Sequence, residues 1–399
     1  MSSAQSSIDP CTLSRMPQRG PVCKCSSPLD YFKCSLYVPH MSIPKGRGAS
    51  VNTTSTRFNL PQRAAEGEWL DAQGEIDGGA PPLVTSVTVV HPRTILSRNT
   101  SPDIPFDQSV NAYQGCEHGC IYCYARPSHA FHDLSPGLDF ESRLLAKPDA
   151  PALLRSALAR RGHVPTPIAM GTNTDPYQPI EREWKITRGC IAVLAECGHP
   201  LTITTKSDRV VRDLDLLAPM AERGLVAVAL SVTTLCADTH RRLEPRAPSP
   251  ARRLAAIRAL AAAGVPVHVS VSPIIPAITD HALEAILDAA WEAGARTASY
   301  IPVRLPHEVA PLFRDWLAVH YPDRAAKVMA QVADLRGGRD NDPAFGTRMR
   351  GQGVWAQLIR TRFKIACKRL GLNAVRVELR QDLFEPPLGE GQGAQLRLI

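Results

Sequence analysis

Short apolar runs alternate with helical patterns from about residue 81 to residue 306, and this alternation constrains the fold more than any other feature of the sequence. It is typical of repeated β-α units around a parallel sheet, because consecutive parallel strands need a long crossover that is usually a helix. The runs that predict strands are apolar and β-branched and lie at residues 167–171, 201–205, 225–232, 265–274 and 297–303. A further strand is expected just before Tyr113, where the pattern is weaker.

The helix expected after the fourth strand carries the clearest start and stop signals. Ser249 is a suitable N-cap, Pro250 fits the first helical position, and Gly264 ends the pattern. Similar signals bound residues 208–224 and 280–294. The apolar residues of the first helix fall on one face: Leu254, Ile257 and Leu260.

Six such units, rather than eight, predict an α/β fold with a partial, open (β/α)6 barrel of TIM type over residues 81–306. In such a barrel, functional groups lie on the loops at the C-terminal ends of the strands. A doubly wound open sheet is the alternative.

Two flanking regions differ from this core. Residues 1–80 are rich in Ser, Pro, Gly and Thr without a sustained period, which predicts a low-complexity segment that is largely disordered or draped over the core. Met41 is an alternative initiator to Met1. Residues 45–63 look less like a low-complexity segment than the residues before them.

Residues 307–399 predict a mainly helical, basic C-terminal extension. The helical pattern runs to residue 372, and residues 374–379 resemble a strand. Nine Lys or Arg and two Asp lie between Arg336 and Arg369. The residues expected on buried helix faces are Trp316, Leu317, Val328, Val332, Trp355, Leu358, Ile359 and Phe363.

Composition limits the class of protein. No apolar run approaches the roughly 18–20 residues of a membrane span, and the first residues lack a secretory signal pattern, so a cytoplasmic protein without a membrane partner is expected. Eleven cysteines argue for reduced thiols and metal ligands rather than a disulfide framework. The net charge of +8 fits an anionic partner such as nucleic acid, and it fits an ordinary basic enzyme equally well.

The central motif is a CxxxCxxC pattern formed by Cys116, Cys120 and Cys123 on a loop after the expected first strand. Thiolates are the usual ligands of iron–sulfur clusters, and three of them leave one iron of a cubane open to a substrate or cofactor. Gly115 and Gly119 suit a loop that folds tightly around a cluster. A structural zinc site would need a fourth ligand, usually from a second pair, and a thioredoxin-like site would be CxxC alone.

The other cysteines show no comparable pattern that indicates a metal site or a catalytic site. Cys190 and Cys197 share a helix face and are expected to be small buried apolar residues. Cys23, Cys25 and Cys34 lie in the N-terminal segment. Cys236 follows the fourth strand and is the extra thiol nearest the expected active face.

The cysteine motif, with Tyr122 before its last cysteine, resembles the signature of the radical S-adenosylmethionine (SAM) superfamily. The resemblance implies a [4Fe–4S] cluster, SAM bound through its methionine end to the open iron, and a 5′-deoxyadenosyl radical that abstracts hydrogen from a substrate. It also implies a reductant such as flavodoxin or ferredoxin. Four further segments, at residues 171–175, 205–207, 231–234 and 243–246, together with residues 271–276, resemble the spore photoproduct lyase and DNA repair photolyase branch, closest to its uncharacterised members.

This branch resemblance assigns residues to the cofactor. It implies that Thr172, Asn173 and Thr174 bind the methionine end of SAM, that Lys206 and Ser231 contact its carboxylate and ribose, and that Tyr122 and Tyr124 lie beside the cluster or the adenosyl group. Without the resemblance, residues 172–174 would be interpreted as turn residues and Lys206 as a solvated lysine at a strand end. The two tyrosines would be interpreted as aromatic residues of the core. Asp175 and Tyr177 are expected to line the substrate side.

The branch resemblance also shows a departure. Spore photoproduct lyases place a hydrogen-donor cysteine beside the cofactor residues after the second strand, whereas this chain has no cysteine in residues 170–175. Efficient spore photoproduct lyase activity is therefore not expected. Cys236 is the candidate substitute donor, and Tyr124 is a second candidate catalytic residue.

Three functions fit the sequence. The first is a radical SAM enzyme, lyase-like, that acts on nucleic acid in a DNA-repair type of reaction. The second keeps the radical chemistry and directs it to a protein or small molecule. The third is a nucleic-acid-binding protein with a structural cluster.

Overall fold

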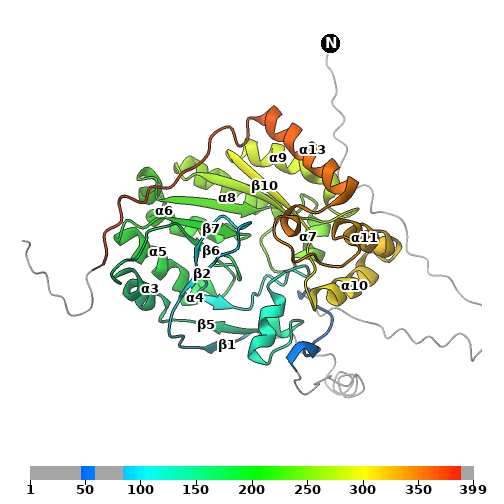
Figure 1. Ribbon diagram of the computed structural model, residues 1–399, viewed down its shortest axis with the longest axis horizontal. Helices are drawn as coiled ribbons and strands as arrows, with labels where there is room; N and C mark the ends of the chain where they lie inside the picture. Colours follow the sequence, from blue (N-terminus) through cyan, green and yellow to red (C-terminus); the bar gives the residue numbers. More distant parts are fainter. Residues whose placement is uncertain (1–45, 59–83, 388–399) are drawn as a thin grey trace, which may run out of the picture.

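The computed structural model describes residues 46–58 and 84–387, and Figure 1 shows its arrangement. Its main sheet has seven strands in the order β10-β9-β8-β7-β6-β3-β2. Six of these strands are parallel to their neighbours: β3 (Gln108–Val110), β6 (Ile168–Met170), β7 (Leu201–Thr205), β8 (Val226–Ser231), β9 (Val267–Ile274) and β10 (Thr297–Pro302). β2 (Leu96–Arg98) pairs with β3 in the antiparallel sense and forms the edge.

This sheet confirms the partial (β/α)6 barrel. Every strand expected for the barrel is present, including the weak one before Tyr113, which is β3. The six parallel strands follow one another across the sheet in chain order, whereas a doubly wound sheet would reverse direction part-way. The outer layer consists of α3 (Ala150–Leu158), α5 (Ile186–Glu196), α6 (Leu214–Glu222), α8 (Pro250–Ala262) and α9 (Leu283–Glu292).

The helix signals read from the sequence are also confirmed in α8. The Ser249 side chain accepts a hydrogen bond from the backbone N–H of Arg252, and Pro250 is the first helical residue. Short helical turns η5 (Asp208–Asp213) and η6 (Asp280–Ala282) precede α6 and α9. Smaller pieces complete the core: α4 (Glu181–Trp184), α7 (Ala237–Leu243), and the sheet of β1 (Ser86–Val89), β5 (Arg143–Ala146) and β4 (Tyr113–Gln114).

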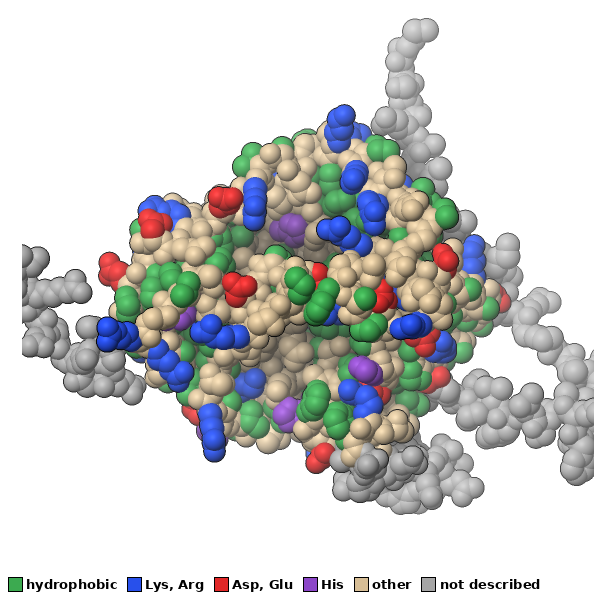
Figure 2. Space-filling model, viewed as in Figure 1, with side chains coloured by type: hydrophobic (Ala, Val, Ile, Leu, Met, Phe, Trp, Pro, Cys, Tyr) green, Lys and Arg blue, Asp and Glu red, His purple; other side chains and the backbone are tan. Residues whose placement is uncertain are grey.

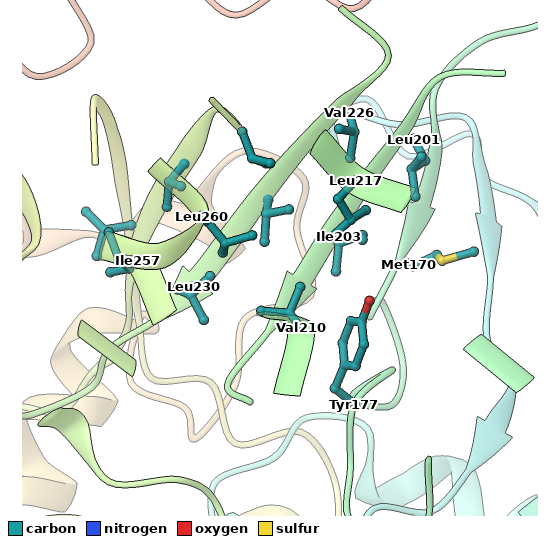
Figure 3. Close-up of a cluster of buried hydrophobic side chains, with 14 of the residues drawn as sticks. Met170, Tyr177, Leu201, Ile203, Val210, Leu217, Val226, Leu230, Ile257 and Leu260 are labelled. Carbon is teal, nitrogen blue, oxygen red and sulfur yellow. The ribbon is translucent and has the colours of Figure 1, made fainter. Parts of the chain in front are cut away.

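The main sheet has two different faces because alternate strand residues point in opposite directions. Its outer face is mainly apolar, and Figure 3 shows Met170, Ile203 and Leu230 packed with side chains from the covering helical segments. The intervening residues on the inner face are small or polar and at least partly exposed: Thr202, Thr204, Ala227, Ala229, His268, Ser270 and Ser299. The barrel is therefore held together from outside, and its inner side is left open to solvent.

The C-terminal extension is helical as expected, with α10 (Val309–His320), α11 (Pro322–Leu335), α12 (Thr347–Arg350) and α13 (Gly353–Leu370). Trp316, Leu317, Val328, Val332 and Ile359 are buried, whereas Trp355 and Phe363 are partly buried. The prediction for Leu358 was wrong, because its side chain is 53% exposed. It lies about 100° around the helix from Ile359, on the face turned away from the barrel.

The strand predicted at residues 374–379 was also wrong. The chain after α13 crosses the loops at the start of the strands, where the backbone N–H groups of Asn373, Arg380 and Glu385 donate to the carbonyls of Arg296, Gly224 and Cys197. Figure 1 shows this segment running along the outside of the barrel. One backbone hydrogen bond to each of three separate loops does not make the continuous hydrogen-bond ladder of a β-strand.

Two further findings concern the N-terminal segment and membrane contact. Residues 46–58, including η3 (Thr56–Phe58), are packed against the core, while the rest of residues 1–80 lies outside the described residues. Within residues 46–58 and 84–387, no helix has both the length and the apolar character needed to cross a membrane.

The contrast between two neighbouring residues of α13 tests this packing. Ile359→Ala should lower the free energy of unfolding by about 2–5 kcal/mol, because it opens a cavity in the barrel core. Leu358→Ala should change it by no more than about 0.5 kcal/mol, as exposed substitutions usually do. Urea unfolding followed by circular dichroism measures both, and equal losses would contradict the assigned faces of α13.

Candidate functional site

The three cysteines of the central motif lie on one loop between β4 and η4 (Arg126–His132), beyond the C-terminal end of β3. All three are free; Cys116 and Cys120 are buried and Cys123 is partly exposed. Burial, then the charges of Asp175, Cys120 and Cys123, raise the pKa of Cys116 well above its usual range. Burial also raises the pKa of Cys120 to about 12, although Lys206 opposes the rise.

Burial therefore disfavours the thiolate form of Cys116 and Cys120 unless a cation compensates its charge. A bound metal does so by displacing the thiol protons. No group of three or more His, Cys, Asp or Glu side chains in residues 46–58 and 84–387 is arranged to hold a single metal ion. A cubane cluster does not need ligands that converge on one ion, because each thiolate binds a different iron of the cluster.

The loop, which we call the cluster loop (residues 115–125), is fixed by backbone bonds to two distant segments. The N–H of Cys116 donates to Phe140 O at 2.8 Å, and the N–H of Ile121 donates to Leu243 O at 3.2 Å. Gly119 has a φ of +66°, and a Cβ there would lie 2.8 Å from a Glu141 carboxylate oxygen. The tight fold expected around Gly119 is therefore present.

Glu141 is a buried carboxylate that ties the cluster loop to residues 46–49. It accepts hydrogen bonds from the backbone N–H groups of Gly48 and Ala49, each at 2.9 Å, and forms a buried ion pair with Arg126. Gly48 lies so close to the loop that a Cβ would be 1.9 Å from Gly119 O. Residues 46–49 are therefore part of the site.

Glu244 holds the other side of the cluster loop. Its carboxylate accepts from the hydroxyls of Tyr122 and Thr233 and pairs with Arg253 and His240. Burial would raise the pKa of Glu244, but Arg253, His240 and Lys206 hold it well below its usual range. The hydrogen bond to Glu244 therefore fixes the buried Tyr122 side chain, which belongs to the cluster loop.

The segment after β6 contains the residues expected at the methionine end of SAM. Thr172 and Asn173 are partly exposed, and Thr174 is buried with its hydroxyl donating to Tyr113 O at 3.1 Å. The Asn111 side chain donates to Thr172 Oγ1 at 3.0 Å and accepts from the N–H of Asn173 at 3.0 Å. Thr172 and Asn173 line a polar cavity of about 330 Å³ together with Thr94, Ile95, Ser97, Ser109, Asn111, Gln114 and Lys147.

Lys206 and Ser231 lie at the C-terminal ends of β7 and β8. The ammonium of Lys206 is 5.9 Å from the centroid of the Tyr122 ring. Ser231 is buried, and its carbonyl accepts from Arg253. Both side chains therefore belong to the same end of the barrel as the cluster loop.

Asp175 links the cluster loop to the end of β7. It accepts from Thr205 Oγ1 at 2.6 Å and from the N–H of Lys206 at 2.7 Å, and it lies 3.4 Å from His118 Nδ1. Burial would raise the pKa of Asp175, but His118 and these donors lower it to about 2. His118 lies between two of the cysteines in the sequence, and its buried contact with Asp175 connects the cluster loop to the segment after β6.

Three other predicted residues lie in different surroundings. Tyr177 is fully buried in the core shown in Figure 3 and donates to Asp213 at 3.0 Å, so the expectation that it lines the substrate side was wrong. Tyr124 is 50% exposed and donates to Thr172 O. Cys236 is the buried N-cap of α7 and is disulfide-bonded.

Sequence analysis missed Asn111, Glu141 and Arg253, and it gave Glu244 no role. The signal for Glu244 was present, since it belongs to one of the segments that carried the resemblance. Nothing local predicts that Glu141 accepts from Gly48 and Ala49, because these residues lie about 90 residues away in the chain.

Comparisons with known proteins agree with this arrangement. Residues 110–290 match the family model described as the radical SAM superfamily. This chain contains a radical SAM domain. A [4Fe–4S] cluster and SAM are the cofactors of this family. The matched residues begin in β3 and extend into α9, and they include the whole cluster loop.

The similar proteins are mostly uncharacterised. A protein of Mycobacterium tuberculosis is 38% identical over 226 residues, which cover 56% of this chain and 66% of that relative, just under two thirds of its length. A protein of Methanocaldococcus jannaschii is 29% identical, covering 54% and 76%. A spore photoproduct lyase mutant with bound AdoMet and dinucleoside spore photoproduct has a TM-score of 0.50 at 15% identity, covering 77% and 93%, which shows a shared fold.

The ion pair between Glu244 and Arg253 gives the most direct test of how the radical SAM site is supported. Glu244→Gln should lower the free energy of unfolding by about 3–5 kcal/mol, because Arg253 keeps its charge in a buried place without a carboxylate. Asp288→Asn removes the exposed pair with Arg369 and should cost less than about 1 kcal/mol. Chemical unfolding compares the two variants, and a small loss in Glu244→Gln would show that the buried pair does not support the loop.

Proposed function

We propose that the protein is a radical SAM enzyme whose [4Fe–4S] cluster is held by Cys116, Cys120 and Cys123. The observation that carries the proposal is the set of three free thiols on one tightly folded loop, at the C-terminal end of the first barrel strand. When bound, the cluster and SAM supply a 5′-deoxyadenosyl radical that abstracts hydrogen from a substrate. The protein's contribution is to hold the loop, orient the cofactor and limit access.

The residues proposed for SAM surround the cluster loop. Thr172, Asn173 and Thr174 would bind its methionine end, and the positive charge of Lys206 suits its carboxylate. Ser231 and Tyr122 would bind the remainder, with Tyr124 beside them. We infer a cytoplasmic protein that receives electrons from flavodoxin or ferredoxin.

A nucleic acid is the proposed substrate class, in a lyase-like reaction of the DNA-repair type. The support is the basic C-terminal extension, and Figure 2 shows Lys and Arg side chains gathered where Figure 1 places α13. Contacts within the protein already engage several of these Lys and Arg side chains, so fewer of them can bind a phosphate. Arg348, Arg362 and Arg369 already pair with Asp103, Glu284 and Asp288, and Arg336 binds backbone carbonyls. Arg350, Lys364 and Lys368 are exposed and free to contact phosphates.

Two alternatives remain distinct in their outcomes. A radical enzyme acting on a protein or small molecule would form 5′-deoxyadenosine without binding nucleic acid. A nucleic-acid-binding protein with a structural cluster would bind nucleic acid and form none.

Cysteine substitutions test the cluster ligands. Anaerobically reconstituted protein should contain about four irons per chain, and Cys116→Ala, Cys120→Ala or Cys123→Ala should each abolish the visible absorption of the cluster. Cys367→Ala is the matched control, because Cys367 is also free and buried but lies in α13. Iron analysis and absorbance spectra make the comparison, and an intact cluster in Cys120→Ala would overturn the ligand assignment.

The expected products define the reaction further. We expect 5′-deoxyadenosine formation without appreciable repair of a spore photoproduct dinucleotide, because residues 170–175 contain no thiol to return hydrogen to a substrate radical. Incubation of the reduced protein with SAM and this dinucleotide, followed by chromatography, measures both products. Repair at many turnovers would contradict this expectation, and its loss in Cys236→Ala would identify Cys236 as a substitute donor formed by reduction of its disulfide.

A further inference from the structure

Four aromatic side chains are exposed around the cluster loop, although large aromatic residues are usually buried at least in part. The exposed fractions are 50% for Tyr124, 69% for Phe131, 37% for Phe58 and 58% for Phe345. Tyr124 directly follows the last cysteine, and Phe131 lies in η4, the next element. An exposed group of rings at one end of a barrel indicates a contact surface.

Arginines accompany these rings. The guanidinium carbons of Arg304, Arg57 and Arg348 lie 5.4, 5.0 and 4.7 Å from the ring centroids of Tyr124, Phe58 and Phe345. The rings of Phe58 and Phe131 are 5.1 Å apart. The surface therefore alternates π faces with positive charge.

Contacts between side chains, together with closeness in the chain, join these residues into one rim. Arg304 Nη1 is 3.2 Å from Met349 Sδ, beside Arg348, and Arg57 donates to Pro127 O at 2.9 Å and pairs with Glu308 at 2.7 Å. We call this surface the aromatic rim; it comprises Arg57, Phe58, Tyr124, Phe131, Arg304, Phe345 and Arg348. The rim follows the loops at the C-terminal ends of β3 and β10, next to the proposed cofactor site.

Charge favours an anionic partner for the rim. Asp103 and Glu308 neutralise Arg348 and Arg57. Among the described residues, Arg304 has no carboxylate within ion-pair distance, and the exposed Arg350 lies next to Met349 in the chain. The rim is therefore positive overall.

We propose that the aromatic rim binds single-stranded nucleic acid, or an unpaired stretch in a duplex, by stacking bases on its rings. Aromatic platforms interleaved with positive charge are how proteins bind single strands without reading sequence, since every base has a π face. Bases in an intact duplex are stacked on each other and cannot reach these rings. This inference rests on the proposed nucleic-acid substrate and specifies its form.

The same chain offers a matched control. Trp291 is 40% exposed on α9, and Arg296 lies 5.9 Å from its ring centroid. Arg296 directly precedes β10, so this pair lies at the opposite end of the strand from Arg304. It repeats the chemistry of the rim away from the cluster loop.

The test is fluorescence anisotropy with a labelled oligonucleotide of about 12 nucleotides, as a single strand and as a duplex. We expect Phe131→Ala with Phe345→Ala to weaken single-strand binding by about tenfold or more, because stacking contributes roughly 1–3 kcal/mol per base. Trp291→Ala should change it by less than about twofold. Phe345→Trp should retain affinity and Phe345→Leu should lose it, which separates stacking from apolar contact. Iron content checks that each variant is intact.

Other outcomes overturn the inference in distinguishable ways. Equal losses for single strand and duplex, or an equal loss in Trp291→Ala, would reject stacking at the rim while leaving a nucleic-acid substrate in place. If no nucleic acid binds but 5′-deoxyadenosine still forms, the rim proposal and the substrate class fail and the radical SAM function stands. Binding that depends only on Lys364 and Lys368 would assign the contact to α13 instead.

Discussion

The site depends on two buried carboxylates that hold the cluster loop from opposite sides. Glu141 ties the loop to residues 46–49 through Arg126 and two backbone N–H groups, and Glu244 ties it to β8 and α8 through Tyr122 and Arg253. Each carboxylate is fully paired, which is the condition under which buried charge is tolerated. A loop held in this way keeps three cysteine thiols on one short segment, two of them buried.

The residues that stabilise the barrel and the residues of the candidate site lie on different parts of the sheet. Its outer face is mainly apolar and packs against helices, so residues such as Ile203 and Val228 stabilise the barrel from the side opposite the inner face. The inner face carries small polar residues and stays open. Chemistry can therefore be placed at the strand ends, where Lys206, Ser231 and the cluster loop meet, without weakening the core.

The sequence predicted the barrel well because each strand and helix is signalled locally. The outer strand residues are apolar, and α8 has its own cap in Ser249. The carboxylate partners were not predictable, because Glu141 contacts Gly48 across 93 residues and no local pattern encodes that approach. Leu358 and residues 374–379 failed for a similar reason, since an apolar residue on a helix or an extended run does not specify which neighbour covers it. The roles of individual cofactor residues stay proposals.

The central claim is that the three thiols hold a cluster with an open iron that activates SAM. The most direct measurement is 5′-deoxyadenosine and methionine, quantified by mass spectrometry after anaerobic incubation of the reduced, reconstituted protein with SAM. The account predicts both products in equal amounts from the unmodified protein, and neither from protein in which all three cysteines of the cluster loop are replaced. Equal product from the two proteins, or none from the unmodified protein with an intact reduced cluster, would contradict it.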